Sequence, residues 1–226
     1  MTSSLKLVIF DVDGTLVDSQ YDIVSCMNEA FAAAGLPAPD RASILSIVGL
    51  SLPQAIAHLA KEAAPTVQDE IVATYKAAFA RRRQAGSGHS LPLFPGARAA
   101  LDGIHAVPHW LLGIATGKSR RGLNALLDGA GLGHLFLTKQ VADDHPSKPH
   151  PSMITTALSE TGVAPGDAVV IGDTRFDMDM AAAAGVPFIG VSWGYHAAET
   201  LTESIGILDR FEDLKPILDT MWGIGS

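Results

Sequence analysis

Four short, continuous apolar runs constrain the fold of this 226-residue chain more than any other feature. They occupy residues 5–10, 110–115, 168–171 and 187–191. Such runs, bounded by glycine, proline or polar residues, are typical of strands that are buried on both faces. Helical patterns separate the later runs. They cover residues 120–130, 152–161 and 178–184, and a glycine follows each of these patterns. This alternation predicts an α/β fold with a doubly wound parallel sheet.

Residues 18–83 break the alternation, because every pattern in this stretch is helical. The expected helices cover residues 21–34, 41–48, 52–63 and 68–83. Glycine and proline then recur through residues 86–96 and lead back to the main pattern. We therefore predict two units: an α/β core of residues 1–17 and 90–226, and a helical unit of residues 18–89. The chain would cross between them near residues 15–19 and 86–92.

The composition excludes some classes of partner. The chain carries a formal net charge of −8, so it has no basic excess with which to neutralise a nucleic acid. No apolar run is long enough to span a bilayer, so we expect no membrane association and a cytoplasmic location. The sequence leaves open whether the protein is a monomer or a homodimer.

Polar residues follow the predicted strands at their carboxyl ends. Asp11 and Asp13 follow the first strand, Thr116 the second and Asp173 the third. Because these strand ends meet at one edge of a parallel sheet, we expect the side chains to lie together. Lys148, in the loop before the next helix, is expected at the same edge.

The residue types in this set indicate phosphoryl transfer. Two carboxylates as close as Asp11 and Asp13 repel each other unless a cation or a proton lies between them. Oxygen ligands without histidine or cysteine favour Mg²⁺ over Zn²⁺. The hydroxyl of Thr116 and the ammonium of Lys148 are donors suited to phosphate oxygens.

Four motifs resemble those of the haloacid dehalogenase superfamily, and specifically of its phosphatases. They are Asp11-Val12-Asp13-Gly14-Thr15, Thr116-Gly117-Lys118, Lys148-Pro149 and Gly172-Asp173-Thr174-Arg175-Phe176-Asp177. Their order matches that of the family, and the resemblance extends from residue 5 to about residue 194. The phosphoglycolate phosphatase branch is the most similar. The resemblance implies a Rossmann-like core with a helical cap domain inserted just after the first motif.

The resemblance also implies roles for the site residues. Asp11 would be the nucleophile that forms an aspartyl phosphate, and Asp13 would protonate the leaving alcohol and later activate water. Asp11, the backbone carbonyl of Asp13 and Asp173 would hold Mg²⁺. Thr116 and Lys148 would bind the phosphoryl group, and Asp177 would orient Lys148 or a water held by the metal. The acid at Asp13 argues against dehalogenation.

The expected substrate is a small phosphorylated metabolite, with phosphoglycolate as the leading candidate. Thr116, Gly117 and Lys148 are the expected substrate contacts in the core, and Gly49 and Arg81 those in the helical cap. Gly49 equally fits a simple turn, and Arg81 fits an exposed charge at a helix end. Asp177 also fits a charge at a helix N-terminus. Gly117 and Lys118 fit a role in positioning Thr116, and Lys118 equally fits a solvated residue at a helix start.

Two other functions remain open at this point. A phosphomutase of the β-phosphoglucomutase type uses the same nucleophile and the same acid and base. A non-catalytic protein that binds phosphate or a partner has no need of Asp11, so the complete set of acids argues against it.

Overall fold

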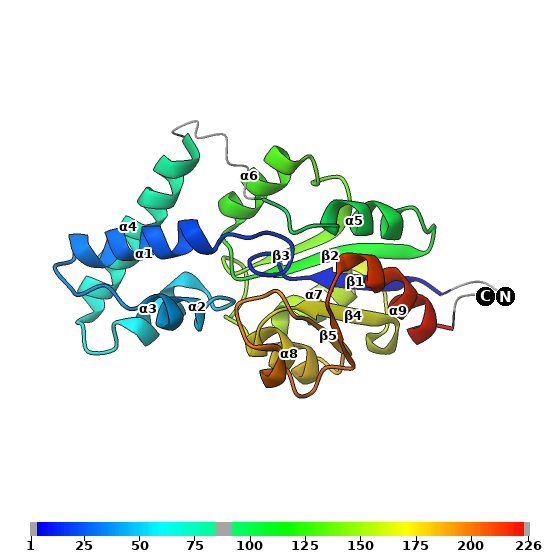
Figure 1. Ribbon diagram of the computed structural model, residues 1–226. Helices are drawn as coiled ribbons and strands as arrows, with labels where there is room; N and C mark the ends of the chain where they lie inside the picture. The colour runs from blue at the N-terminus through cyan, green and yellow to red at the C-terminus, as the bar shows by residue number, and fades with distance from the viewer. Residues whose placement is uncertain (1–3, 85–91, 224–226) are drawn as a thin grey trace.

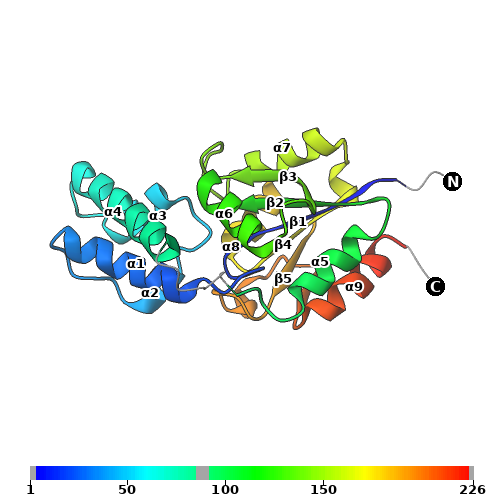
Figure 2. The same cartoon turned by 90° about the horizontal axis from the view of Figure 1, so that it is seen from above.

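The computed structural model describes residues 4–84 and 92–223. Figures 1 and 2 show an α/β core with a group of helices, the cap, at one end of it. The cap consists of helices α1 to α4, which the chain forms after strand β1 and before helix α5. A helical insertion after the first strand is therefore confirmed.

The core contains one six-stranded parallel sheet in the order β3-β2-β1-β4-β5-β6. The strands are β1 Lys6–Phe10, β2 Trp110–Thr116, β3 Phe136–Val141, β4 Ala168–Gly172, β5 Phe188–Val191 and β6 Gly206–Leu208. From β1 the chain adds two strands on one side, then returns to add three on the other. The strand order thus reverses between β1 and β4, and in such sheets ligands bind outside the carboxyl ends at that point. The predicted doubly wound sheet is confirmed.

Helices cover both faces of the sheet. One face carries α5 Ala97–His105, α6 Arg120–Ala130 and α9 Leu214–Met221, and the other carries α7 Ser152–Thr161 and α8 Arg175–Ala183. Short 3₁₀ turns occupy Pro165–Asp167, Ala198–Thr200 and Phe211–Asp213. Strand β1 contributes Val8 and Phe10 to one layer of the core, and Leu7 and Ile9 to the other. Burial on both faces explains its unbroken apolar sequence.

Local sequence signals set the helix ends. Helix α6 begins after Ser119, whose Oγ accepts a hydrogen bond from the Gly122 amide at 3.2 Å. It ends at Gly131, which has a φ of 63° that a β-carbon would disfavour. Helix α8 begins at Arg175, earlier than the predicted residue 178, because Thr174 and Asp177 form a capping box.

The cap helices are α1 Gln20–Ala33, α2 Arg41–Leu45, α3 Leu52–Leu59 and α4 Pro65–Gln84. They pack around an apolar core of their own, separate from the two layers that flank the sheet. The boundaries 18 and 89 of this unit stay predictions. The expected return near residues 86–92 lies, apart from Pro92, outside the described residues.

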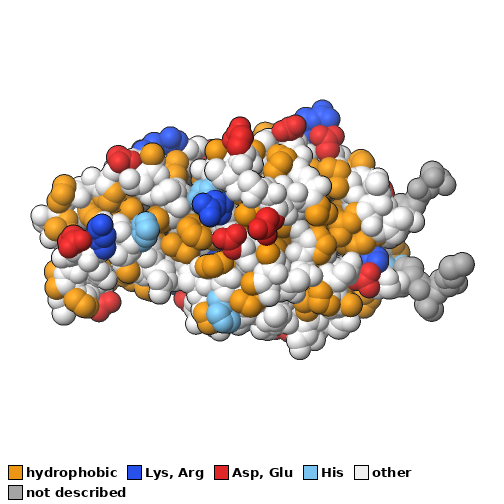
Figure 3. Space-filling view, turned by 90° about the horizontal axis from the view of Figure 1, so that it is seen from below, with side chains coloured by type: hydrophobic (Ala, Val, Ile, Leu, Met, Phe, Trp, Pro, Cys, Tyr) orange, Lys and Arg blue, Asp and Glu red, His pale blue; other side chains and the backbone are white. Residues whose placement is uncertain are grey.

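The described surface is mixed in character. Figure 3 shows acidic and basic side chains scattered among apolar and neutral ones over one face of the cap and core. Within residues 4–84 and 92–223, no helix combines the length and the apolar character needed to cross a bilayer.

Candidate active site

The carboxyl edge of the sheet gathers the polar residues that follow the strands. The loops after β1 and β4, the last residue of β2, the loop before α7 and the first turn of α8 all contribute to it. The side chains that they bring here, all buried, are Asp11, Asp13, Thr116, Lys148, Asp173 and Asp177. Residues up to 166 positions apart in the chain thus meet where the strand order reverses.

Lys148 lies at the centre of this group, between two carboxylates. Its Nζ donates to Asp11 Oδ1 at 2.7 Å and to Asp177 Oδ1 at 2.6 Å. Burial alone would lower the pKa of Lys148, but the charges of Asp11 and Asp177 outweigh it and raise this pKa above its usual value. Lys148 is therefore a permanent cation. An ammonium has three N–H donors, so one remains for a further acceptor.

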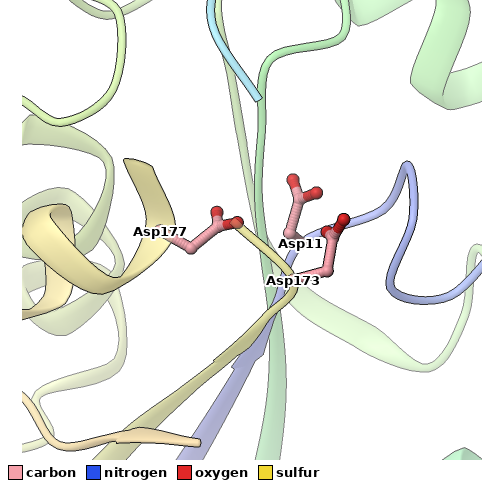
Figure 4. A group of neighbouring side chains, drawn as sticks. All are labelled: Asp11, Asp173 and Asp177. Atoms are coloured by element: carbon pink, nitrogen blue, oxygen red, sulfur yellow. The ribbon is translucent and has the colours of Figure 1, made fainter. Parts of the chain in front are cut away.

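Three carboxylates form an acidic cluster around this cation. Oxygens of Asp11, Asp173 and Asp177 all lie within 4.8 Å of one another, and Figure 4 shows the three groups converging from two strand ends and a helix start. One ammonium cannot neutralise three buried carboxylates. Burial raises the pKa of Asp11 to about 7, and burial with the neighbouring acids raises that of Asp173 well above its usual value.

The cluster fits a hard divalent cation. Asp11 Oδ2 is buried and has no hydrogen-bond partner, although its sister oxygen is held by Lys148. A buried, unpartnered carboxylate oxygen is costly, and a cation would satisfy it. All three side chains offer oxygen, which is the ligand atom that such ions prefer.

Asp173 is fixed by hydrogen bonds and by two glycines. Its carboxylate accepts from Thr15 Oγ1 at 2.9 Å and from the Tyr195 amide at 2.8 Å. A β-carbon on Gly14 would lie 2.2 Å from Asp173 Oδ2, and one on Gly194 would lie 2.0 Å from Asp173 Cβ. The backbone at these two glycines therefore packs directly against Asp173.

Asp177 has a structural and an electrostatic role at once. Its Oδ2 accepts from the Thr174 amide at 3.1 Å and the Thr174 hydroxyl at 2.6 Å, which closes the capping box of α8. Its Oδ1 faces Lys148. Asp177 thus lies in the first turn of α8 and also contacts Lys148, a placement compatible with both interpretations drawn from the sequence.

Asp13 points away from the acidic cluster. Its Oδ1 accepts from Ser19 Oγ and lies 2.8 Å from Lys118 Nζ. Tyr195 fixes Ser19 in turn, because its hydroxyl accepts from the Ser19 amide at 2.9 Å. The resemblance implies that Asp13 holds the metal through its backbone carbonyl. That role stays a prediction.

A cavity of about 360 Å³ opens between the cap and this edge of the sheet. Asp11, Asp13 and Thr116 line it, as do Gly117 and Gly49. The two glycines also bring cap and core together, since a β-carbon on Gly117 would lie 2.8 Å from the Gly49 carbonyl oxygen. Gly49 has a φ of 104°, in the region that favours glycine.

Two predicted substrate contacts do not line the cavity. Arg81 is exposed and pairs with Glu29 on the surface of the cap, so its placement matches the helix-end charge rather than a substrate ligand. Lys148 is completely buried behind Asp11 and is not among the lining residues. Its expected contact with a phosphoryl group stays a prediction.

The sequence interpretation missed three residues around Asp13. Lys118 is mostly buried and paired with Asp13, so it is not a solvated helix-start residue. Ser19 and Tyr195 hold the same carboxylate in place. A hydrogen bond between residues 176 positions apart leaves no periodic signal, so only the structure reveals this contact.

Comparison with known proteins agrees with the geometry. A family model described as haloacid dehalogenase-like hydrolase matches residues 8–191. The chain is 36% identical to "Probable phosphatase IndB" of Dickeya dadantii, over 92% of this chain and 91% of that protein. It is 32% identical to a phosphoglycolate phosphatase of Rhodospirillum rubrum, over 95% and 90%. A solved haloacid dehalogenase-like hydrolase from Streptococcus pneumoniae superposes with a TM-score of 0.80 at 26% identity, over 96% and 99%.

The raised pKa of Asp11 predicts how stability depends on pH without metal. Between the ordinary pKa of 3.8 and about 7, the folded protein binds more protons than the unfolded chain. Raising the pH through this window should therefore lower the free energy of unfolding, by on the order of 1–4 kcal/mol. Urea unfolding in EDTA measures it, and Asp11→Asn should flatten the slope. Equal slopes in both proteins would contradict the prediction.

The glycine enclosure of Asp173 predicts a large effect of a small substitution. In Gly194→Ala the added methyl must displace Asp173, so we expect a loss of about 1–3 kcal/mol in unfolding free energy. Divalent cations should also stabilise this variant less, as thermal unfolding with and without Mg²⁺ would show. Gly166→Ala is the control, because its methyl meets no atom within 4 Å. Equal behaviour of the two variants would rule out the enclosure.

Proposed function

The chain belongs to the haloacid dehalogenase-like hydrolase family and is a phosphatase of that type, and we propose that it cleaves a small phosphorylated metabolite through an aspartyl phosphate on Asp11. One observation carries this proposal. Asp11 and Asp13, two residues apart, lie in different surroundings: Asp11 in the acidic cluster, and Asp13 towards Ser19 and Lys118. Two carboxylates separated in this way suit two different roles in one reaction.

In the first step Asp11 is the nucleophile. One oxygen of its carboxylate forms a bond to phosphorus while the bond from phosphorus to the alcohol oxygen breaks. Lys148 donates to Asp11 Oδ1, which orients the carboxylate for attack. Thr116 lines the cavity beside Asp11, and its hydroxyl is available to a phosphoryl oxygen. The leaving alcohol takes its proton from Asp13.

In the second step Asp13 acts as a base. It takes a proton from water, whose oxygen attacks the phosphorus of the aspartyl phosphate and releases phosphate and free Asp11. Ser19 and Lys118 hold Asp13 Oδ1, so the acid keeps one orientation through both steps. Asp177 acts through Lys148 and is a positioning residue.

Mg²⁺ is the cofactor that we propose. The carboxylates of Asp11 and Asp173 and the backbone carbonyl of Asp13 would hold it, and the unpartnered Asp11 Oδ2 supports this assignment. When bound, the ion supplies positive charge that offsets the charge of the phosphoryl oxygens. Asp177 is already engaged by Lys148 and Thr174, so we assign it no direct bond to the ion.

The physiological ester is the open part of the proposal. The name of the Rhodospirillum rubrum relative, with the branch resemblance of the motifs, makes phosphoglycolate the first candidate to assay. A cytoplasmic location and a monomeric or homodimeric state remain predictions from the sequence.

The nucleophile assignment predicts the behaviour of Asp11→Asn. Hydrolysis of p-nitrophenyl phosphate with Mg²⁺ should fall by roughly 10³-fold or more, because an amide cannot form the acyl phosphate. Asn has the shape of Asp, so the variant should unfold cooperatively. Asp102→Asn, on the exposed face of α5, is the matched control and should keep full activity.

Two outcomes would contradict the proposal. Normal turnover by Asp11→Asn would exclude the aspartyl phosphate. Isomerisation of a sugar phosphate by the unmodified protein, without net release of phosphate, would identify a mutase instead.

A further inference from the structure

The cavity beside Asp13 is larger than a small alcohol needs. Its volume of about 360 Å³ lies within the range of about 300–1,000 Å³ that is typical of pockets for small-molecule ligands. The two-carbon glycolate of phosphoglycolate would leave most of this space to water. The lining of the remaining space therefore indicates what kind of alcohol the protein accepts.

The two sides of the cavity differ in chemistry. The core side is polar and carries Asp11, Asp13, Thr116 and Lys118. The cap side, which we call the apolar cap wall, comes from α1, α3, α4 and the loop after α2. Its main side chains are Ile23, Met27, Ile47, Leu52, Tyr75 and Phe79. An apolar wall of this extent favours a ligand with an apolar surface.

The cations near the cavity are poorly placed for a small carboxylate. Lys118 is already paired with Asp13, and its Nζ lies 5.3 Å from the centre of the Phe79 ring. Lys76 is the only charged side chain among the described cap residues that line the cavity, and it is exposed. Arg121 on α6 is exposed as well. Contacts of exposed cations with an anion are screened by water and contribute little.

Tyr75 supplies one polar group within the apolar cap wall. It lines the cavity, and its hydroxyl forms no hydrogen bond with another described residue. Burial and the nearby Asp13 raise the pKa of this hydroxyl above its usual value, so it stays protonated and can donate. A ligand with one oxygen on an otherwise apolar body would match this surface.

From these features we infer that the leaving alcohol presents an apolar body, larger than glycolate, to the apolar cap wall. The inference rests on the proposed phosphatase function and specifies its substrate class. It ranks phosphoglycolate below phosphate esters of larger apolar primary alcohols. Methylene groups added to the alcohol should be buried against Leu52 and its neighbours, and each should strengthen the binding of the transition state.

A homologous series of esters tests this ranking. With Mg²⁺, kcat/KM should rise from ethyl to n-butyl to n-hexyl phosphate, by up to about fourfold per methylene. Phosphoglycolate should fall below n-butyl phosphate. The primary alcohols in the series have similar reactivity, so the trend reports the cavity rather than the leaving group. A flat series with phosphoglycolate at its top would overturn the inference.

Two leucine variants on α3 locate the effect. Leu52 lines the cavity, and Leu59 packs into the cap core without lining it. Leu52→Asn should flatten the dependence of kcat/KM on alkyl chain length, whereas Leu59→Asn should keep the parent trend. Equal flattening in both variants would mean that cap stability, not wall contact, sets the preference, and would contradict the inference.

Binding of non-hydrolysable analogues separates this inference from the proposed function. In calorimetric titrations of the Mg²⁺-loaded protein, n-hexylphosphonate should bind at least tenfold more tightly than ethylphosphonate. That result without turnover of any ester would support the apolar cap wall and contradict the phosphatase proposal. Turnover of the esters with equal affinity for both phosphonates would support the phosphatase proposal and contradict the inference about the apolar cap wall.

Discussion

The buried contact of Lys148 with Asp11 and Asp177 is the interaction on which the rest of the site depends. It joins the loop before α7, the end of β1 and the start of α8 through two hydrogen bonds at 2.7 and 2.6 Å. Removing one partner of a buried ion pair typically costs about 3–5 kcal/mol, because the other charge is left uncompensated. With Asp173 added, however, carboxylates outnumber the ammonium three to one. The arrangement that stabilises the edge of the sheet therefore also leaves an excess of negative charge that a cation can neutralise.

The topology of the sheet makes this meeting possible. Asp11 and Asp173 are far apart in the chain, but β1 and β4 pair in parallel with Phe10 beside Ile171, so the next turns share one edge. Connections from β1 to β3 place helices on one face, and those from β3 to β5 place them on the other. The strand order reverses between β1 and β4, and the core helices that follow these two strands, α5 and α8, pack on opposite faces of the sheet. The acids thus stand at an opening that the fold itself creates.

The sequence predicts most of the core because its signals are local. Apolar runs mark β1, β2, β4 and β5, and glycines mark the ends of α6 and α7. It does not reveal β3, where Thr138, Lys139 and Gln140 interrupt the pattern. Buried Thr138 and Gln140 are tolerated there because both donate to Glu160 of α7, at 2.6 and 2.8 Å. That partner lies 20 residues or more further along the chain, so a window of neighbouring residues cannot show it.

Part of the candidate site can likewise be predicted from local sequence signals, and part of it cannot. Each acid of the cluster follows a strand end or begins a helix, so its position could be predicted from a short motif. The residues around Asp13 could not, because Ser19 and Tyr195 meet only when the cap is docked on the core. Arg81 is the opposite case: a basic run at a helix end is visible in the sequence, but the side that it faces depends on the packing of α4 against α1. In that packing Arg81 forms an ion pair with Glu29.

Asp13 stands at the junction of the two units, which explains why its surroundings come from both. The chain leaves for the cap within a few residues of Asp13, and Lys118 from the core contacts both this carboxylate and the ring of Phe79 on α4. In the reaction that we propose, the fixed charges of the core face the phosphoryl group, and the apolar residues of the cap face the alcohol. The bond that breaks lies between these two environments. A proton donor for the alcohol must therefore sit at their boundary, and the insertion of the cap directly after the first motif puts Asp13 there.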